Sequence, residues 1–229
     1  MTSLDSRRAL LLLALLTIVS AAAATTVPFT EAFASDAAGW RNGPDTAAAD
    51  WIGAGGADGG GHIRQPFNFV NSVPGPQGPV LFRAEDEDNA SGGAFIGDWI
   101  ADGVTALTAW VRHDATVPVN FFVRFAGPAN FPGATAVSFA PIAPGAWTPI
   151  AIGIDPFNPQ FVSFEGTDFN TVFSNIGHVQ VGVAVPDALA GVDQIFDFDL
   201  DLVTITPEPS SAALLALGLL AAAGLRRRP

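Results

Sequence analysis

The feature that most constrains this chain is a two-residue alternation of apolar and polar side chains that recurs through its middle. In the stretch PVNFFVRFAG, Val119, Phe121, Val123 and Phe125 fall on one face of an extended strand. Similar alternation occurs in VTALTAWVRHD, ATAVSFAPI, AWTPIAIGI, HVQVGVAV and QIFDFDLDLVTI. Segments rich in proline and glycine, such as VPGPQGP and PDALAG, separate these runs. The pattern predicts a series of short strands joined by turns.

Helical signals are weak in the same region. The segment DFNTVFSNIG is the one stretch that reads as a helical turn, and it is too short for a long helix. Strands without intervening helices favour antiparallel pairing over a parallel sheet. Residues 25–206 are therefore expected to form an all-β domain, an antiparallel β-sandwich of the jelly-roll type.

The charge of the chain excludes some classes of function. All ten basic residues are arginines, and the chain has no lysine and no cysteine. Between the two terminal segments there are five arginines and twenty acidic residues, a net formal charge of −15. This sign opposes nucleic-acid binding, and it suits solubility outside a cell or the binding of divalent cations. The absence of cysteine excludes disulfides, thiolate zinc sites and a cysteine nucleophile.

The N-terminal segment has the three parts of a secretory signal peptide. Arg7 and Arg8 precede an apolar run from Ala9 to Val19, and the small residues Ala22 and Ala24 follow it. We expect residues 1–24 to be removed, with cleavage after Ala24. An uncleaved membrane anchor is the alternative, but the apolar run is short for a bilayer.

A second apolar run, Ser211 to Leu225, precedes three arginines, Arg226, Arg227 and Arg228. A helix of this length reaches about 22 Å, less than a hydrocarbon core of about 30 Å, but arginines that snorkel allow it to span. The arginines are expected to stop transfer and to remain in the cytoplasm. The preceding domain would then lie on the outer side of the inner membrane, after export by Sec-type machinery.

Pro207, Glu208 and Pro209, the apolar run and the arginine cluster together resemble a PEP-CTERM sorting signal. The resemblance covers residues 207–229. It implies that the triplet is recognised by exosortase, a membrane enzyme of Gram-negative bacteria. It further implies that the apolar helix is removed and that the protein reaches the cell surface or the extracellular matrix, often in a biofilm with exopolysaccharide.

A second resemblance concerns the domain itself. FTEAFASDAAGW near the start, with DFNTVFSNIGHVQVGV and FDLDLVTI near the end, is similar to the first and last strands of carbohydrate-binding modules and laminin-G-like sandwiches. This resemblance implies a structural Ca²⁺ held by Glu31 and Asp201, with Asp199 as a neighbour. The alternative is that Asp197, Asp199 and Asp201 form a solvated strand face, because a period of two also predicts that stripe.

Two further groups of residues are candidates for binding. Trp40 and Trp51 lie in loop-like, glycine-rich sequence, where exposed indoles would stack on sugar rings, although tryptophan more often packs in a core. The run RAEDEDNASGG brings together Glu85, Asp86 and Glu87 with a fourth acid. Such a run is usually a solvated loop, and a second Ca²⁺ site is the alternative.

The sequence carries no motif that predicts catalysis. It has no G-x-S-x-G elbow, and its three histidines, His62, His113 and His178, are isolated from any matched nucleophile. A pair of carboxylates for glycoside hydrolysis cannot be recognised by spacing alone. We therefore expect a non-enzymatic component of the matrix or the cell surface that binds polysaccharide. An adhesion or structural module without a glycan ligand is the alternative, and a glycan-active enzyme is a third hypothesis.

Overall fold

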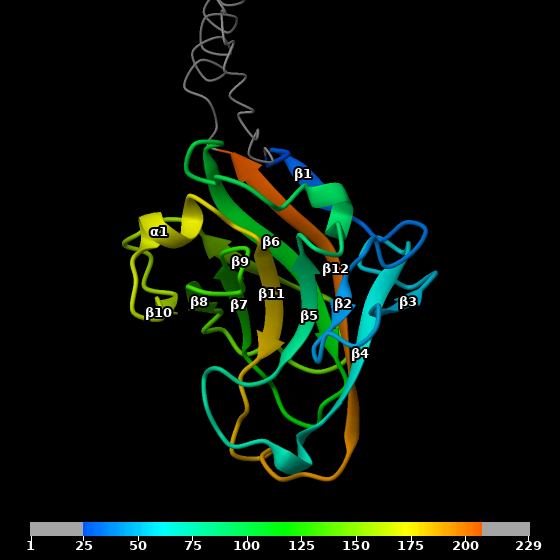
Figure 1. Cartoon of the computed structure of the whole chain (residues 1–229). Coiled ribbons are helices and arrows are strands. Elements are labelled where there is room, and N and C mark those ends of the chain that lie inside the picture. The colour runs from blue at the N-terminus through cyan, green and yellow to red at the C-terminus, as the bar shows by residue number, and fades with distance from the viewer. Residues whose placement is uncertain (1–24, 208–229) are drawn as a thin grey trace, which may run out of the picture.

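A computed structural model describes residues 25–207, which form two antiparallel sheets stacked as a sandwich (Figure 1). The elements in chain order are β1 (Phe29–Glu31), β2 (Arg41–Asn42), β3 (Asp50–Ile52), β4 (His62–Asn68), η1 (Phe69–Asn71), β5 (Val80–Glu85), η2 (Ala90–Gly93), β6 (Val104–His113), β7 (Phe121–Ala126), β8 (Gly133–Val137), β9 (Thr148–Gly153), β10 (Phe161–Ser163), α1 (Phe169–Phe173), β11 (His178–Val183) and β12 (Ile195–Pro207). The prediction of an all-β fold is thus confirmed, and α1 is the helical turn expected from DFNTVFSNIG.

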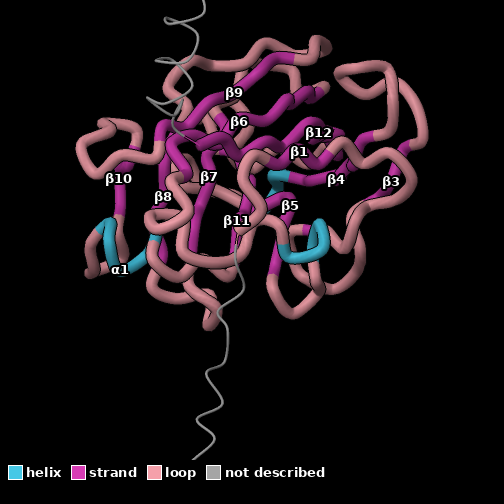
Figure 2. Tube along the Cα trace, turned by 90° about the horizontal axis from the view of Figure 1, so that it is seen from above, coloured by secondary structure: helices cyan, strands magenta, loops and turns pink. Residues whose placement is uncertain are grey.

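Each sheet has six strands. In the first, called sheet A here, the order is β3-β4-β12-β6-β9, with β1 also paired to β12. In the second, sheet B, the order is β10-β8-β7-β11-β5-β2. Figure 2 shows the two layers from above, with β9, β6, β12 and β4 in one and β8, β7, β11 and β5 in the other. The narrower assignment as a jelly roll stays a prediction.

The core lies between the sheets and is built by the alternation seen in the sequence. In β6, Leu107, Ala109 and Val111 are fully buried. In β7, Phe121 and Phe125 are fully buried in the same way, and both strands present their other side chains to the outer faces. Because side chains of a strand alternate between faces, one apolar set per strand is enough to fill the space between two sheets.

Several outer-face residues are buried despite the alternation, and Phe122 is an apolar example. Phe122 lies on the outer face of sheet B yet is only 2% exposed. Its ring lies against Gly182 on β11, the residue directly opposite it. A Cβ at position 182 would collide with this ring, so glycine there is what allows the ring to lie flat on the neighbouring strand.

Among the described residues, β12 is the longest strand, and it holds sheet A together. Its first half pairs with β4 and its second half with β1, so that these two short strands follow one another along the same edge. The register shifts between Asp201 and Thr204, and Leu202 has a left-handed backbone with φ of 47°. Before the β-bulge the even-numbered residues Phe198 and Leu200 face the core. Because the bulge adds one residue to the strand, the odd-numbered residues Val203 and Ile205 face the core after it.

The described chain begins and ends at the same end of the sandwich (Figure 1). The backbone N–H of Thr25 donates to Asp102, and Pro207 pairs with Val104. Within residues 25–207, no helix is both long and apolar enough to cross a membrane. The predicted signal peptide with Ala22 and Ala24, and the apolar segment with its arginines, lie outside the described residues.

Candidate functional site

A row of charged side chains crosses the outer face of sheet A. Asp50 on β3 lies opposite Arg64 on β4, Arg64 opposite Asp199 on β12, and Asp199 opposite Arg112 on β6. The signs alternate along the row, and directly opposite residues in antiparallel strands are close enough to interact. The row therefore brings together residues that are as many as 149 positions apart in the chain.

Asp199 is the centre of this row. Its carboxylate is buried and accepts hydrogen bonds from Arg64 Nε at 2.7 Å and from Arg112 Nε at 2.8 Å. Arg64 also donates through Nη1 to Asp197 at 2.8 Å. The hydrogen bond to Asp199 is the main reason why the pKa of Arg64 is raised. Charge-assisted bonds of this length hold both guanidinium groups on the outer face of sheet A.

A cavity of about 430 Å³ opens over the row. It is lined by Arg64, Arg112, His113, Asp114, Gly145, Asp197 and Asp199. The side chains of Arg64 and Asp197 remain about a third exposed there, at 32% and 36%. The cavity therefore offers both fixed donors and fixed acceptors to a ligand from solvent.

Trp147 lies beside the row. The guanidinium of Arg112 stacks over its ring, with Cζ 4.5 Å from the ring centroid. Its indole N–H donates to the backbone carbonyl of Gly55 at 2.9 Å, and Arg112 Nη1 reaches the same carbonyl at 3.3 Å. Trp147 and Arg112 thus anchor the glycine-rich loop between β3 and β4.

His62 lies beneath this arrangement with 1% of its surface exposed. Burial lowers its pKa, and the Asp199 carboxylate, 3.6 Å away, offsets this only in part. The ring meets Trp147 edge-to-face at a centroid distance of 5.3 Å. A neutral His62 is therefore expected at neutral pH, where it supports Trp147 and contributes no charge.

A second group of acids gathers at the bulge of β12. Asp201 is fully buried and accepts hydrogen bonds from the backbone N–H groups of Ala57 and Leu202, both at 2.7 Å. Burial, with a further contribution from the carboxylates of Asp58 and Glu31, raises its pKa to about 6. A buried carboxyl with two acidic neighbours has oxygen ligands of the kind that Ca²⁺ takes.

The structure separates the three residues predicted to hold calcium. Glu31 and Asp201 come near one another because β1 pairs with the half of β12 that follows the bulge. Asp199 belongs to the arginine row, where two guanidinium groups occupy its oxygens. Two cations at hydrogen-bond distance from this carboxylate oppose the approach of a third cation. The expectation that Asp199 lies beside a calcium ion is therefore corrected.

The two tryptophans predicted to bind sugar differ in exposure. Trp40 has no exposed surface and packs edge-to-face against Phe33 and Phe95, so the prediction that it stacks on a glycan is wrong for this structure. Trp51 is 41% exposed, on the edge strand β3 beside Asp50. Trp51 thus keeps the exposure that a stacking platform requires, but it lies opposite the core residue Ile63 and therefore on the other face of sheet A from the arginine row.

The sequence alone does not indicate Arg64, Arg112 and Trp147 as a group. Alternation placed Arg112 outside the core, since Val111 before it faces inward. However, nothing in the order of residues indicates that β4, β12 and β6 are neighbours. The pairing that brings the two arginines to Asp199 is a property of the sheet.

Comparison with known proteins gave one match to a family motif. Residues 206–228 match the PEP-CTERM protein-sorting motif. The PEP-CTERM motif implies a membrane-anchored sorting signal, export, and processing by exosortase. Pro207 is the one residue of the predicted Pro207-Glu208-Pro209 triplet that the structure describes, and it ends β12. No significant match was found among curated proteins.

Solved structures resemble the domain that precedes the PEP-CTERM motif. An exo-β-agarase matches over 80% of this chain and 26% of its own, with 10% identity and a TM-score of 0.51. A xylanase 10B fragment of Clostridium thermocellum with CBM22-1 and GH10 modules, solved with xylohexaose, covers 82% of this chain and 30% of its own, at 16% identity and a TM-score of 0.47. A family 11 carbohydrate-binding module of the same organism covers 80% of this chain and 96% of its own, at 12% identity and a TM-score of 0.42.

This chain spans less than a third of the agarase and xylanase chains that it matches. At 10% identity, the agarase likeness shows the fold alone. The two-sheet architecture is therefore shared with a known structure, and a ligand has to be argued from the residues of this chain.

Proposed function

We propose that this chain is an exported, non-enzymatic protein of the bacterial surface or extracellular matrix that binds a neutral polysaccharide on the outer face of sheet A. The cavity over Arg64, Asp199 and Arg112 carries this proposal. Its fixed donors and acceptors suit the hydroxyl groups of a sugar. The ring of Trp147, which stacks on Arg112 beside the row, supplies an apolar surface.

A neutral glycan is favoured over an acidic one by charge. The sandwich has fifteen more acidic than basic residues, and the cavity contains three aspartates against two arginines. An anionic polymer would be repelled over this surface. The aspartates Asp197 and Asp199 accept hydrogen bonds from arginines, an arrangement that favours binding over the donation of a proton to a glycosidic oxygen.

We expect that Trp147→Ala or Arg64→Ala weakens binding to agarose, xylan or hydroxyethylcellulose at least tenfold, because Trp147 supplies the apolar surface of the contact and Arg64 a fixed donor. Affinity electrophoresis and calorimetry on the full chain in mild detergent measure this. Phe157→Ala is the matched control, since Phe157 is 90% exposed and does not line the cavity. Saturable binding that is unchanged in all three variants would place the glycan elsewhere, and no binding to any polymer would favour an adhesion module.

Sorting has its own test. Glu208→Ala is expected to leave an unprocessed form in the inner membrane, because the variant lacks the acidic residue of the PEP-CTERM triplet. The measurement is the ratio of unprocessed to processed protein on immunoblots of membrane and surface fractions. The control is Glu165→Ala within the sandwich. Unchanged processing of Glu208→Ala would contradict the role of the triplet.

We further propose that Glu31 and Asp201 hold a structural Ca²⁺. The proposal is supported by the burial of Asp201 and by the negative charge of Glu31, which contributes to its raised pKa, with oxygen donors only. Bound calcium would supply the positive charge that this buried group lacks. The ion would tie β1 and the glycine-rich loop to the bulge of β12.

The ionisation of Asp201 gives a pH prediction. Its pKa rises from 3.8 to about 6 on folding, so its contribution to stability is present below pH 4 and is lost as the pH rises through 6. Without Ca²⁺, we expect the wild-type chain to lose up to about 3 kcal/mol relative to Asp201→Asn between pH 4 and pH 7. Denaturant unfolding in EDTA measures this difference.

Calcium is expected to raise the Tm of the wild-type chain at pH 7 and to leave that of Asp201→Asn unchanged. Asp187→Asn, at an exposed position, is the control and should respond like the wild type. An equal response of Asp201→Asn to calcium would remove Asp201 from the site.

A further inference from the structure

Two buried titratable residues on the other sheet have no role in the proposed function. Glu85 at the end of β5 and His178 at the start of β11 lie directly opposite each other. They are on the outer face of sheet B, and each is at most 2% exposed. Their neighbours Ala84 and Val179 face the core, so the pair is separated from the hydrophobic interior by the sheet itself.

Both side chains have a buried polar atom without a hydrogen-bond partner. These atoms are Glu85 Oε2 and His178 Nδ1. The other carboxylate oxygen, Glu85 Oε1, accepts from Arg83 Nη1 at 3.0 Å. Unpartnered polar atoms are uncommon in buried positions because they lose their hydration without compensation.

The tautomer of His178 follows from its second nitrogen. Nε2 lies 3.0 Å from the backbone carbonyl of Pro128. A carbonyl only accepts, so Nε2 carries the hydrogen. In the neutral ring, Nδ1 then presents a lone pair 3.2 Å from Glu85 Oε1, whereas in the protonated ring it can donate to that oxygen. Two acceptors facing each other call for a proton or a metal ion between them.

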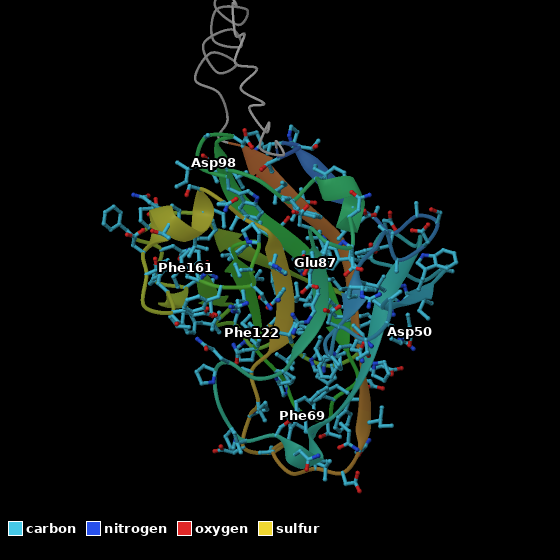
Figure 3. All side chains as sticks on the ribbon, viewed as in Figure 1. Asp50, Phe69, Glu87, Asp98, Phe122 and Phe161 are labelled. Carbon is cyan, nitrogen blue, oxygen red and sulfur yellow. The ribbon has the colours of Figure 1, made fainter. Side chains whose placement is uncertain are left out.

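Glu87 supplies a third ligand. One atom from each of Glu85, Glu87 and His178 lies within 4.8 Å of the others. Figure 3 shows Glu87 just beyond the end of β5. Its side chain is 57% exposed, and its Oε2 lies 3.8 Å from His178 Nε2, the ring nitrogen that also contacts Pro128. An exposed side chain can rotate toward the buried pair with little effect on packing.

We propose that Glu85, Glu87 and His178 form a binding site for a borderline divalent metal ion of the Zn²⁺ class. An imidazole nitrogen with two carboxylates is a donor set that zinc takes. Ligand atoms bound tetrahedrally at about 2.0–2.1 Å lie roughly 3.3 Å apart, which is close to the 3.2 Å between His178 and Glu85. The hydrogen bond to Pro128 orients the ring as the outer-shell partner of a metal-bound histidine does.

The site differs in chemistry from the calcium site proposed at Glu31 and Asp201. That site has oxygen donors only, whereas this one has a nitrogen donor, which hard cations such as Ca²⁺ do not favour. It does not depend on glycan binding. A bound ion would link the acidic turn after β5 to the first residue of β11.

The alternative is a protonated imidazole that forms a buried ion pair with Glu85. Arg83 also provides a positive charge at this carboxylate. The ion pair requires neither Glu87 nor metal, so the two cases differ in their dependence on Glu87.

The test is a Zn²⁺ titration of the full chain in mild detergent at pH 7 with excess Ca²⁺ present, followed by calorimetry and by Tm. Co²⁺ is used as a visible-absorbing substitute. We expect one zinc per chain and a rise in Tm. Glu87→Gln should weaken binding at least tenfold, because it removes a charged ligand. Asp86→Asn is the matched control, with the same change of charge at the neighbouring position.

Glu87→Gln is chosen because its side chain is exposed, so that the variant should fold, which circular dichroism confirms. His178→Gln is the second variant and should remove the nitrogen-dependent absorption of bound Co²⁺. The proposal is overturned if the wild-type chain binds no Zn²⁺, or if Glu87→Gln and Asp86→Asn bind it equally well.

Discussion

Replacement of Trp40 by alanine is expected to lower the free energy of unfolding by about 3 to 5 kcal/mol. Trp40 has no exposed surface, and its ring contacts Phe33 and Phe95 edge-to-face at centroid distances of 5.6 and 5.8 Å. Its indole N–H donates to Ser91 Oγ at 2.9 Å. Truncation would leave a cavity and also remove the partner of that hydroxyl. Denaturant unfolding of the full chain in mild detergent measures the loss.

Two variants make this prediction specific. Trp40→Phe keeps an aromatic ring and should cost much less than the alanine variant. Trp51→Ala removes a partly exposed ring and should change stability by less than about 1 kcal/mol. If Trp40→Ala and Trp51→Ala had equal effects on stability, the assignment of Trp40 to the core would be wrong.

Asp199→Asn is expected to destabilise the sandwich by about 3 kcal/mol and to abolish glycan binding. The carboxylate is almost fully buried and receives hydrogen bonds from both Arg64 and Arg112. Loss of its charge leaves these guanidinium groups without their shared partner, and breaking one side of a buried pair is costly. For a domain of this size, Tm should fall by roughly 6 to 12 °C.

Asp197→Asn is the control for this prediction. Asp197 contacts the same arginine, Arg64, but its side chain is 36% exposed, so solvent screens the pair and the loss should be under about 1 kcal/mol. Thermal unfolding of both variants, followed by binding measurements, separates the two positions. A similar loss of stability in Asp197→Asn and Asp199→Asn would show that burial of the central carboxylate does not matter.

The two-residue alternation of apolar and polar side chains was enough to predict which residues of a regular strand face the core. Leu107, Ala109 and Val111 in β6 are buried as their alternation predicts. The same rule failed in β12, where the bulge after Asp201 moves Val203 and Ile205 to the core side. The position of a β-bulge depends on the strands that pair with the bulged strand, and the order of residues does not indicate which strands these are.

The sequence by itself determined the all-β class, the acidic charge and the sorting motif, because each depends on composition or on local order. Tertiary structure alone decided the charged row on sheet A. Arg64 and Asp199 are 135 residues apart in the chain and meet because β4 pairs with β12. Trp40 and Trp51 occur in similar sequence, but neighbouring aromatic rings bury one and an edge strand exposes the other. Burial and pairing depend on which strands become neighbours, and only the folded sheets fix that.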